Sequence, residues 1–363
     1  MIRLSELKLP LSALPVQERR ASDAPAETDD DRKLAPHPIT ELRRLAALAL
    51  GIGENNISAL TVFKRSFDAR KQNLLVVYIV DISVSDAALE KSLLAKYAKN
   101  AHIQATPNMT WQPPMHAPAD WGHEKHARPV VVGFGPCGIF AALVLAQMGL
   151  KPIVIERGTP VRQRTKDTWG LWRKHILNPR SNVQFGEGGA GTFSDGKLYS
   201  QIKDPRHLGR KVMQEFVRFG APEDILFAAH PHIGTFKLVK VVEGLREEII
   251  RLGGEVRFEQ RVVDIEYEAS SHHTTAVNLD KQTTQHVVAL RIQDYARNET
   301  YILPARHVVL ALGHSARDTF TMLHRHAVAM QAKPFSIGVR IEHPQSVIDR
   351  ARWGQHAGHP LLG

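Results

Sequence analysis

Cysteine is almost absent from this 363-residue chain, which contains Cys137 alone. A single thiol cannot form an intramolecular disulfide. A disulfide reductase that works through its own pair of redox-active cysteines is also excluded, because that exchange needs two thiols. The sequence therefore excludes disulfide chemistry within one chain, both for folding and for catalysis.

Long apolar runs are missing as well. No stretch of the sequence approaches the roughly 20 apolar residues that a helix needs to span a bilayer. The first fifteen residues lack the apolar block and the small-residue cleavage site of a signal peptide. We therefore expect a cytoplasmic protein with no membrane partner.

The charge is basic but not concentrated. Lysine and arginine number 47 against 37 acidic residues, a formal charge of +10, yet no run of five or more basic residues occurs. A basic balance can indicate nucleic acid, an anionic ligand or a membrane surface. Because the charges are spread out, we expect an ordinary basic surface and no nucleic-acid partner.

Metal-binding side chains are not clustered. His230-Pro231-His232 is the most suggestive sequence, but no acid or cysteine lies close to it. A metal site needs three or four such ligands together. We therefore expect no metal site and assign the histidine pair to a turn or to substrate contacts.

Residues 1–115 have the pattern of a small α+β domain. The expected elements are a strand, a helix, a hairpin and a second helix, at residues 1–9, 41–50, 57–84 and 87–99. This order is typical of a ferredoxin-like domain. Within it, residues 11–37 combine Ala-Pro pairs with acidic residues and are predicted to form a flexible loop. Residues 116–128 are expected to link this domain to the remainder, residues 129–363.

The next motif organises the remainder of the chain. Residues 130–132 are three valines, as expected of a strand buried on both faces. A glycine-rich turn follows, then an apolar helix at 139–148 and a second strand at 153–155. This is a βαβ unit, so we predict an α/β protein with a Rossmann-like domain.

Gly133, Gly135 and Gly138 form G-x-G-x-x-G in that turn. The first glycine permits the tight turn, the second lets the backbone approach a pyrophosphate, and the third lets the helix pack closely on the strand. The N–H groups and the dipole of the helix then face the phosphates. Glu156, 23 positions after Gly133, stands near the offset expected for a carboxylate that binds an adenosine ribose. The pattern predicts a dinucleotide site.

A second glycine-rich segment occupies residues 181–198, with five glycines between Gly186 and Gly196. Such a density of glycine favours either close approach to a flat ligand or a mobile loop. A long helix is expected at 235–252, with Thr235 as its N-cap. An antiparallel β-meander is then inserted before a strand at 307–312, and residues 318–332 are expected to be helical.

The strings themselves resemble a known family. GFGPCGIFAALVLAQMG, VIERG, NVQFGEGGAGTFSDGKL, HIGT and VVLALGHSARDTF, with TVFKRSFDARK near the N-terminus, are similar to the bacterial family of uncharacterised FAD-dependent dehydrogenases. That family is similar in turn to flavoproteins with the glutathione-reductase type of FAD domain. The resemblance covers nearly the whole chain and implies an FAD cofactor.

The resemblance also implies roles for individual residues. The pyrophosphate loop would be Gly133, Gly135, Pro136, Cys137 and Gly138. Glu156 would bind the adenosine ribose, Arg157 would flank the adenine, and the backbone of Val262 or Val263 would meet the adenine. Further contacts are implied near the pyrophosphate, at Ala311 and Gly313, and near the flavin, at Gly188, Gly189 and Thr192.

One departure from the family concerns the C-terminus. The fold normally closes with a late strand whose second glycine- and acid-containing motif meets the flavin ribityl chain, and nothing after Gly313 matches that motif. We therefore expect the FAD domain to be incomplete at its C-terminus. The hypothesis that follows is weak or absent FAD binding by this chain.

The resulting interpretation is an FAD-dependent oxidoreductase of unknown substrate, with NADH or NADPH as candidate electron donor. No catalytic residue is assigned, because Asp195, Lys197 and His232 are more simply structural. Two alternatives stay open. One is a flavoprotein that modifies RNA and grips it with the basic N-terminal domain, whose Phe63 to Phe67 mix bases and aromatics. The other is a non-catalytic flavin-binding protein.

Overall fold

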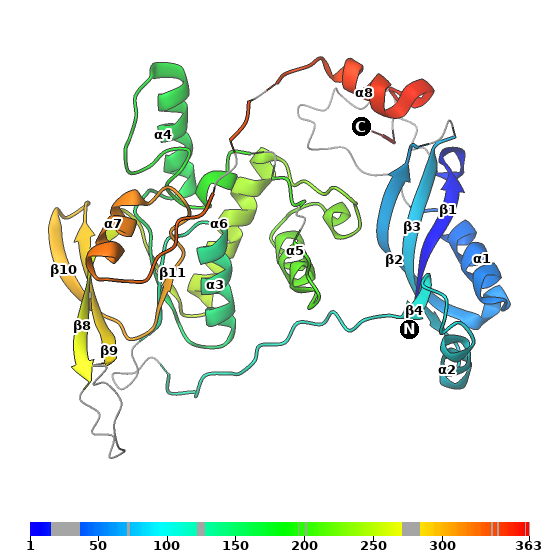
Figure 1. Ribbon diagram of the computed structural model, residues 1–363, viewed down its shortest axis with the longest axis horizontal. Helices are drawn as coiled ribbons and strands as arrows, with labels where there is room; N and C mark the ends of the chain where they lie inside the picture. The colour runs from blue at the N-terminus through cyan, green and yellow to red at the C-terminus, as the bar shows by residue number, and fades with distance from the viewer. Residues whose placement is uncertain are drawn as a thin grey trace.

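The computed structural model is a mixed α/β protein with two units, each built around its own sheet (Figure 1). It describes residues 1–15, 37–70, 73–121, 128–194, 196–199, 202–270, 284–334, 337–339, 341–359 and 361–362. An extended segment after residue 105 runs from the first unit toward the second. The predicted flexible loop and the tip of the predicted meander lie mostly outside these described residues, at 16–36 and 271–283.

The first unit is a four-stranded antiparallel sheet in the order β2-β3-β1-β4, with two helices on one face. Asp86 begins the second of these helices by accepting hydrogen bonds from the N–H groups of Ala88 and Leu89. Apolar residues of the sheet and of the first helix form the core between the layers. The elements are β1 (Ile2–Pro10), α1 (Ile39–Leu50), β2 (Ile57–Asp68), β3 (Leu75–Val84), α2 (Ala87–Lys96) and β4 (Ile103–Ala105).

The second unit contains a parallel sheet in the order β11-β5-β6-β7. In its register Val131 of β5 lies between Val309 of β11 and Val154 of β6. Helices connect the first three strands along the chain, whereas an antiparallel sheet within residues 260–304 lies between β7 and β11. The elements are β5 (Val130–Val132), α3 (Pro136–Gln147), β6 (Ile153–Ile155), α4 (Val161–Lys174), α5 (Leu208–Arg218), α6 (Thr235–Arg251), β7 (Glu255–Arg257) and β11 (Val308–Leu310).

Both faces of the parallel sheet are covered, which explains why β5 is apolar at every position. Val131 belongs to a core shared with α3 and α6, whereas Val130 and Val132 belong to a second core on the opposite face. Successive side chains of a strand point to opposite faces, so each needs its own apolar cover. The second cover consists of β8 (Gln260–Ser270), β9 (Thr284–Asp294), β10 (Glu299–Pro304) and α7 (Arg317–Arg325).

The two units meet at the outer edge of β2. The Arg65 N–H donates to the Phe227 carbonyl at 2.7 Å, and the Ala229 N–H donates to the Arg65 carbonyl at 3.1 Å. The Phe227 ring also packs edge-on against His37, with 4.4 Å between ring centroids. The segment after α5 therefore pairs with an edge strand that would otherwise expose its backbone.

Substituting Phe227 with alanine should loosen this joint. Losing the ring removes apolar cover from the two backbone hydrogen bonds, so hydrogen exchange at the Arg65 and Ala229 amides should accelerate by about tenfold. Exchange measured by mass spectrometry or NMR tests this. Phe236→Ala is the matched control, because that ring is 68% exposed. Equal exchange in the wild type and Phe227→Ala would show that the ring does not stabilise the joint.

Two expectations about helices differ from the structure, and one further helix was not expected. Thr235 is not an N-cap: Gly234 takes that position, and the Thr235 hydroxyl donates instead to the Ser194 carbonyl. The helix expected to reach residue 332 ends at Arg325, and Ala327 adopts a left-handed φ of 55° just beyond it. Helix α8 (Gln345–Trp353) was not predicted, and its Trp353 packs edge-on against Phe67 of β2.

Within the described ranges, no helix is both long enough and apolar enough to cross a membrane.

Candidate functional site

A cavity of about 260 Å³ lies where the parallel strands β5, β6 and β11 end. This edge is where α/β proteins bind ligands, because the turns that follow adjacent strands converge there. Four segments line the cavity: the turn after β5 with the start of α3, the end of β6, the glycine-rich loop, and the turn after β11. The lining residues are Gly133, Phe134, Gly135, Pro136, Cys137, Glu156, Gln184, Phe185, Gly186, Gly189, Ala190, Gly191, Ala311, Leu312, Gly313, His314 and Ser315.

The turn after β5 has no room for side chains at two of its glycines. A Cβ on Gly133, whose φ is +96°, would lie 2.5 Å from the Ala311 carbonyl oxygen. A Cβ on Gly138 would lie 1.9 Å from the Gly133 carbonyl oxygen. The backbones of β5, α3 and the turn after β11 therefore approach closely, and α3 begins in the cavity wall, where the first N–H groups of a helix have no intrahelical partner.

Glu156, at the end of β6, is buried in the wall of this cavity. Its carboxylate accepts hydrogen bonds from the Phe134 N–H at 2.7 Å and from the Gly158 N–H at 2.8 Å. A carboxylate offers about four lone-pair sites, so acceptor capacity remains for a ligand hydroxyl. Glu156 thus fixes both turns and can still bind a ribose.

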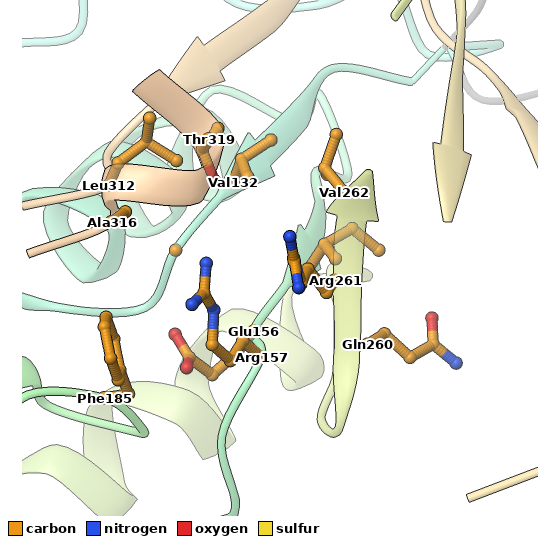
Figure 2. Close-up of a pocket in the computed structure, with 12 residues that line it drawn as sticks. Val132, Glu156, Arg157, Phe185, Gln260, Arg261, Val262, Leu312, Ala316 and Thr319 are labelled. Atoms are coloured by element: carbon orange, nitrogen blue, oxygen red, sulfur yellow. The ribbon is translucent and has the colours of Figure 1, made fainter. Parts of the chain in front are cut away.

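A smaller cavity of about 50 Å³ adjoins the first and shares Gly133, Glu156, Phe185 and Leu312 with it. Figure 2 shows its polar wall, where Arg157 and Arg261 lie beside Glu156. The Arg157 guanidinium stands 4.6 Å from the centre of the Phe185 ring. Of the two valines predicted near an adenine, Val262 lines this cavity and Val263 lines neither.

The glycine-rich loop brings only some of its predicted residues to the cavity. Gly189 lines it, and a Cβ there would lie 2.9 Å from the Gly135 Cα. Gly188 faces the loop interior, where its N–H donates to the Phe134 carbonyl at 2.8 Å. Thr192 is buried behind the loop, and its hydroxyl lies 3.2 Å from Arg164 Nη1. Gly188 and Thr192 therefore shape the loop and do not line its open side.

Sequence reasoning missed the residue that fixes this loop, Arg164 of α4. Its side chain is fully buried and donates to the carbonyls of Asn182, Glu187 and Val183 at 2.8, 2.7 and 3.1 Å. Burial lowers the pKa of this guanidinium to about 10, so it remains charged at neutral pH. A backbone with this many glycines is costly to order. Arg164 supplies the hydrogen bonds that hold it in one conformation.

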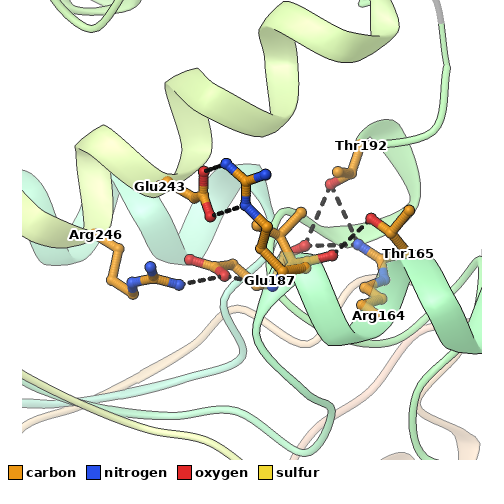
Figure 3. A network of polar contacts seen from close by, with 8 residues as sticks. Arg164, Thr165, Glu187, Thr192, Glu243 and Arg246 are labelled. Carbon is orange, nitrogen blue, oxygen red and sulfur yellow. Dashed lines mark hydrogen bonds and ion pairs between the residues drawn. The ribbon is translucent and has the colours of Figure 1, made fainter.

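Glu187, also unforeseen, closes the same network from within the loop (Figure 3). Its Oε2 accepts from the Val161 N–H and from Arg246 Nη1, both at 2.7 Å, while its Oε1 is buried without a partner among the described residues. Burial raises the pKa of this carboxyl to about 7, against the lowering effects of the Val161 N–H and Arg246. The network joins α4, the loop and α6 behind the cavity.

The remaining predicted residues are placed as follows. Pro136 is the first residue of α3, and Cys137 is exposed beside it in the cavity wall. Ala311 and Gly313 both line the cavity. Lys197 and His232 pair through an isolated β-bridge, and Asp195 lies outside the described residues. In the part of the chain that the structure describes, no three histidine, cysteine or acidic residues cluster as metal ligands would.

Comparison with known proteins gives two family matches and one curated relative. Residues 1–83 match a domain of unknown function (DUF8436), and residues 334–363 match the family described as "FAD-dependent protein, C-terminal domain-like". An uncharacterised protein of Clostridium beijerinckii is 41% identical over 332 residues, which are 89% of this chain and 55% of that protein. The chain thus spans about half the length of the curated relative it matches.

Solved structures that are similar to this chain have lower sequence identity than the clostridial protein. THI4 from Thermovibrio ammonificans has 15% identity and a TM-score of 0.37, over 68% of this chain and 73% of that chain. Glycerol-3-phosphate dehydrogenase from Bacillus halodurans, complexed with FAD, has 14% identity and a TM-score of 0.30, over 52% and 34%. By sequence, then, this chain is similar to an uncharacterised clostridial protein and, in residues 334–363, to the C-terminal domain of FAD-dependent proteins.

Proposed function

We propose that this protein is an FAD-dependent oxidoreductase whose cavity at the ends of β5, β6 and β11 holds the adenosine and pyrophosphate of FAD. One observation carries the proposal: the Gly133–Gly138 turn, the start of α3 and the Glu156 carboxylate line one cavity. Backbone N–H groups at a helix N-terminus bind a pyrophosphate, and an acid at the end of the next strand binds the ribose.

A further observation supports FAD over other dinucleotides. Residues 334–363 match a family whose description is FAD-dependent. The cavity also extends beyond the phosphate loop to the Ala311–Gly313 turn and the glycine-rich loop. Bound FAD would supply the hydride chemistry, and the chain would bind it, orient it and exclude water. The substrate would be a small molecule, with NADH or NADPH as the donor to test first.

We propose a bracing role for the N-terminal unit, as a ferredoxin-like domain. Its sheet order and antiparallel pairing follow the strand–helix–strand–strand–helix–strand arrangement. An RNA grip is less consistent with its side chains. Phe63 is covered by the guanidinium of Arg3 at 3.6 Å, and Arg65 is buried against the second unit. Base stacking needs open aromatic faces.

The direct test is titration of the purified chain with FAD up to millimolar concentration, followed by flavin fluorescence polarisation and by visible absorption after gel filtration. Weak binding that saturates at one FAD per chain within this concentration range is expected. A flat titration with a folded chain would overturn the proposal. Adding NADH or NADPH anaerobically to the complex then asks whether the flavin is reduced, which separates an oxidoreductase from a non-catalytic flavin-binding protein.

Glu156→Gln should weaken FAD binding by about tenfold or more. The amide can accept one backbone hydrogen bond but loses the charge that strengthens bonds to the ribose and to the two N–H groups, an effect of roughly 1.5 kcal/mol. The dissociation constant from the same titration measures it. Glu255→Gln is the control, because Glu255 begins β7 and pairs with Arg257 and Arg128 away from both cavities. Equal FAD affinities of the wild type and Glu156→Gln would show that the Glu156 carboxylate does not bind the cofactor.

A further inference from the structure

We propose that Asp318 determines which adenine nucleotide this site accepts: it engages Arg157 and Arg261 so that they do not bind a phosphate on the adenosine ribose. The inference rests on the proposed function, since it places the adenosine ribose at Glu156, where the larger and the smaller cavity meet. It concerns a residue of α7 that lies 162 positions after Glu156 in the sequence.

Both arginines converge on this one carboxylate. Arg157 Nη2 lies 3.0 Å from Asp318 Oδ1 and 2.9 Å from Oδ2, and Arg261 Nη2 lies 2.7 Å from Oδ2. Arg157 follows β6 and Arg261 lies at the start of β8, and both line the small cavity together with Glu156 (Figure 2). Asp318 thus connects α7 to two arginines of the cavity wall, although it does not line the cavity itself.

The cavity wall combines two features that normally exclude one another. A carboxylate at the end of the second strand selects a free ribose hydroxyl and repels a 2′-phosphate, whereas an arginine nearby accommodates that phosphate. Here Glu156 and two arginines stand together. A guanidinium group can bind two oxygens of a phosphate as well as two oxygens of a carboxylate. Without Asp318, the two arginines would therefore favour a phosphorylated ribose.

Asp318, together with Glu156, neutralises the positive charge of the two arginines. With Asp318 included, two arginines face two carboxylates and the local formal charge is zero; without it the charge is +1. Burial raises the pKa of Asp318, but hydrogen bonding to Arg157 and the charges of both arginines outweigh burial, so its pKa lies below the usual value. Asp318 is therefore ionised at neutral pH. A ribose phosphate would have to displace it from guanidinium groups that it already binds.

The experiment uses two probes that differ by one phosphate, ADP-ribose and 2′-phospho-ADP-ribose, in isothermal titration calorimetry. The wild type should bind ADP-ribose at least tenfold more tightly than the phosphorylated probe. Asp318→Asn should reduce this preference by about tenfold or more, because the amide cannot neutralise the arginines. Asp318→Glu keeps the charge and should keep a preference for ADP-ribose.

A control separates local from general charge effects. Asp68→Asn changes the net charge by the same amount and removes a carboxylate bound to an arginine, Arg70 at 2.6 Å, but in the first unit. It should leave the preference unchanged. Melting curves establish that each variant is folded.

The possible outcomes are distinct. An unchanged preference in folded Asp318→Asn overturns this inference and leaves the proposed function intact. If that variant loses affinity for both probes equally, the inference is also overturned, since Asp318 would then stabilise the site without selecting its ligand. A folded wild type that binds neither probe overturns the proposed function, and the inference with it.

Discussion

Gly138→Ala should abolish FAD binding and lower the free energy of unfolding by about 3 kcal/mol or more. Overpacking by one methyl group usually costs about 1 to 3 kcal/mol, and less when a side chain can rotate away. Here the new Cβ would lie 1.9 Å from the Gly133 carbonyl oxygen and 2.9 Å from its carbonyl carbon. Both atoms belong to the backbone, so relief requires α3 to move away from β5.

That movement would also open the phosphate site. Helix α3 begins at Pro136, within the same turn, and Pro136 and Cys137 line the cavity where the first N–H groups of the helix lack intrahelical partners. Displacing the helix would therefore move these donors and widen the space between Gly133 and Gly138. Stability and FAD affinity should fall together, because one backbone contact sets both.

Chemical denaturation and the FAD titration measure the two effects. Gly170→Ala is the matched control, since Gly170 also lies within a helix and its Cβ would lie 3.9 Å from the Ile176 carbonyl oxygen. Because alanine favours helix, this control should be neutral or more stable by up to about 1 kcal/mol. If Gly138→Ala behaves like Gly170→Ala, the close packing of α3 on β5 is not what builds the site.

The βαβ unit could be predicted because its requirements are local. Three successive valines indicate a strand covered on both faces, and Gly138 meets a local steric demand set by the Gly133 carbonyl. Residues 130–132, 136–147 and 153–155 form the expected strand, helix and strand. The demand on Gly133 is not local, because its Cβ would meet the Ala311 carbonyl oxygen, and only the resemblance placed Ala311 and Gly313 at this site.

The supporting network could not be predicted because its partners are distant in sequence. Arg164 and Glu187 look like ordinary charged residues until α4 is folded against the loop, and Asp318 pairs with Arg157 across 161 positions. The partner of a long side chain can be identified only when the position of the partner's helix, strand or loop in the fold is known. The resemblance placed Gly188 and Thr192 near the flavin, and neither lines the cavity. Glycine density indicates a tight loop but not which side of it faces a ligand.

The pH dependence of stability should reveal Glu187. Its carboxyl is fully buried, and burial raises its pKa from 4.5 to about 7. Between these values the folded chain holds a proton that the unfolded chain releases, so the wild type loses stability as pH rises through this window. Since each pH unit of displacement corresponds to about 1.4 kcal/mol, the loss is on the order of 3 kcal/mol.

Glu187→Gln removes this titration. The variant should therefore gain stability relative to the wild type, by on the order of 3 kcal/mol, between pH 4.5 and pH 7.5. The amide also binds Arg246 more weakly than the carboxylate does. Because the charge of Arg246 does not change in this pH range, that loss shifts the stability difference by a constant amount and leaves its slope against pH unchanged. The informative quantity is the difference in free energy of unfolding at each pH, from urea denaturation.

Glu243 supplies a control of opposite sign in the same network. Its hydrogen bond to Arg162 lowers its pKa, so the folded chain releases a proton that the unfolded chain still holds, and its stabilisation is lost as pH falls. Glu243→Gln should therefore lose stability relative to the wild type as pH rises through the acid range. If the stability differences of both variants have the same slope against pH, burial does not raise the pKa of Glu187. Slopes of opposite sign would establish that the glycine-rich loop is held by a carboxyl whose charge is unfavourable at neutral pH and is tolerated because Arg246 and the Val161 N–H bind it.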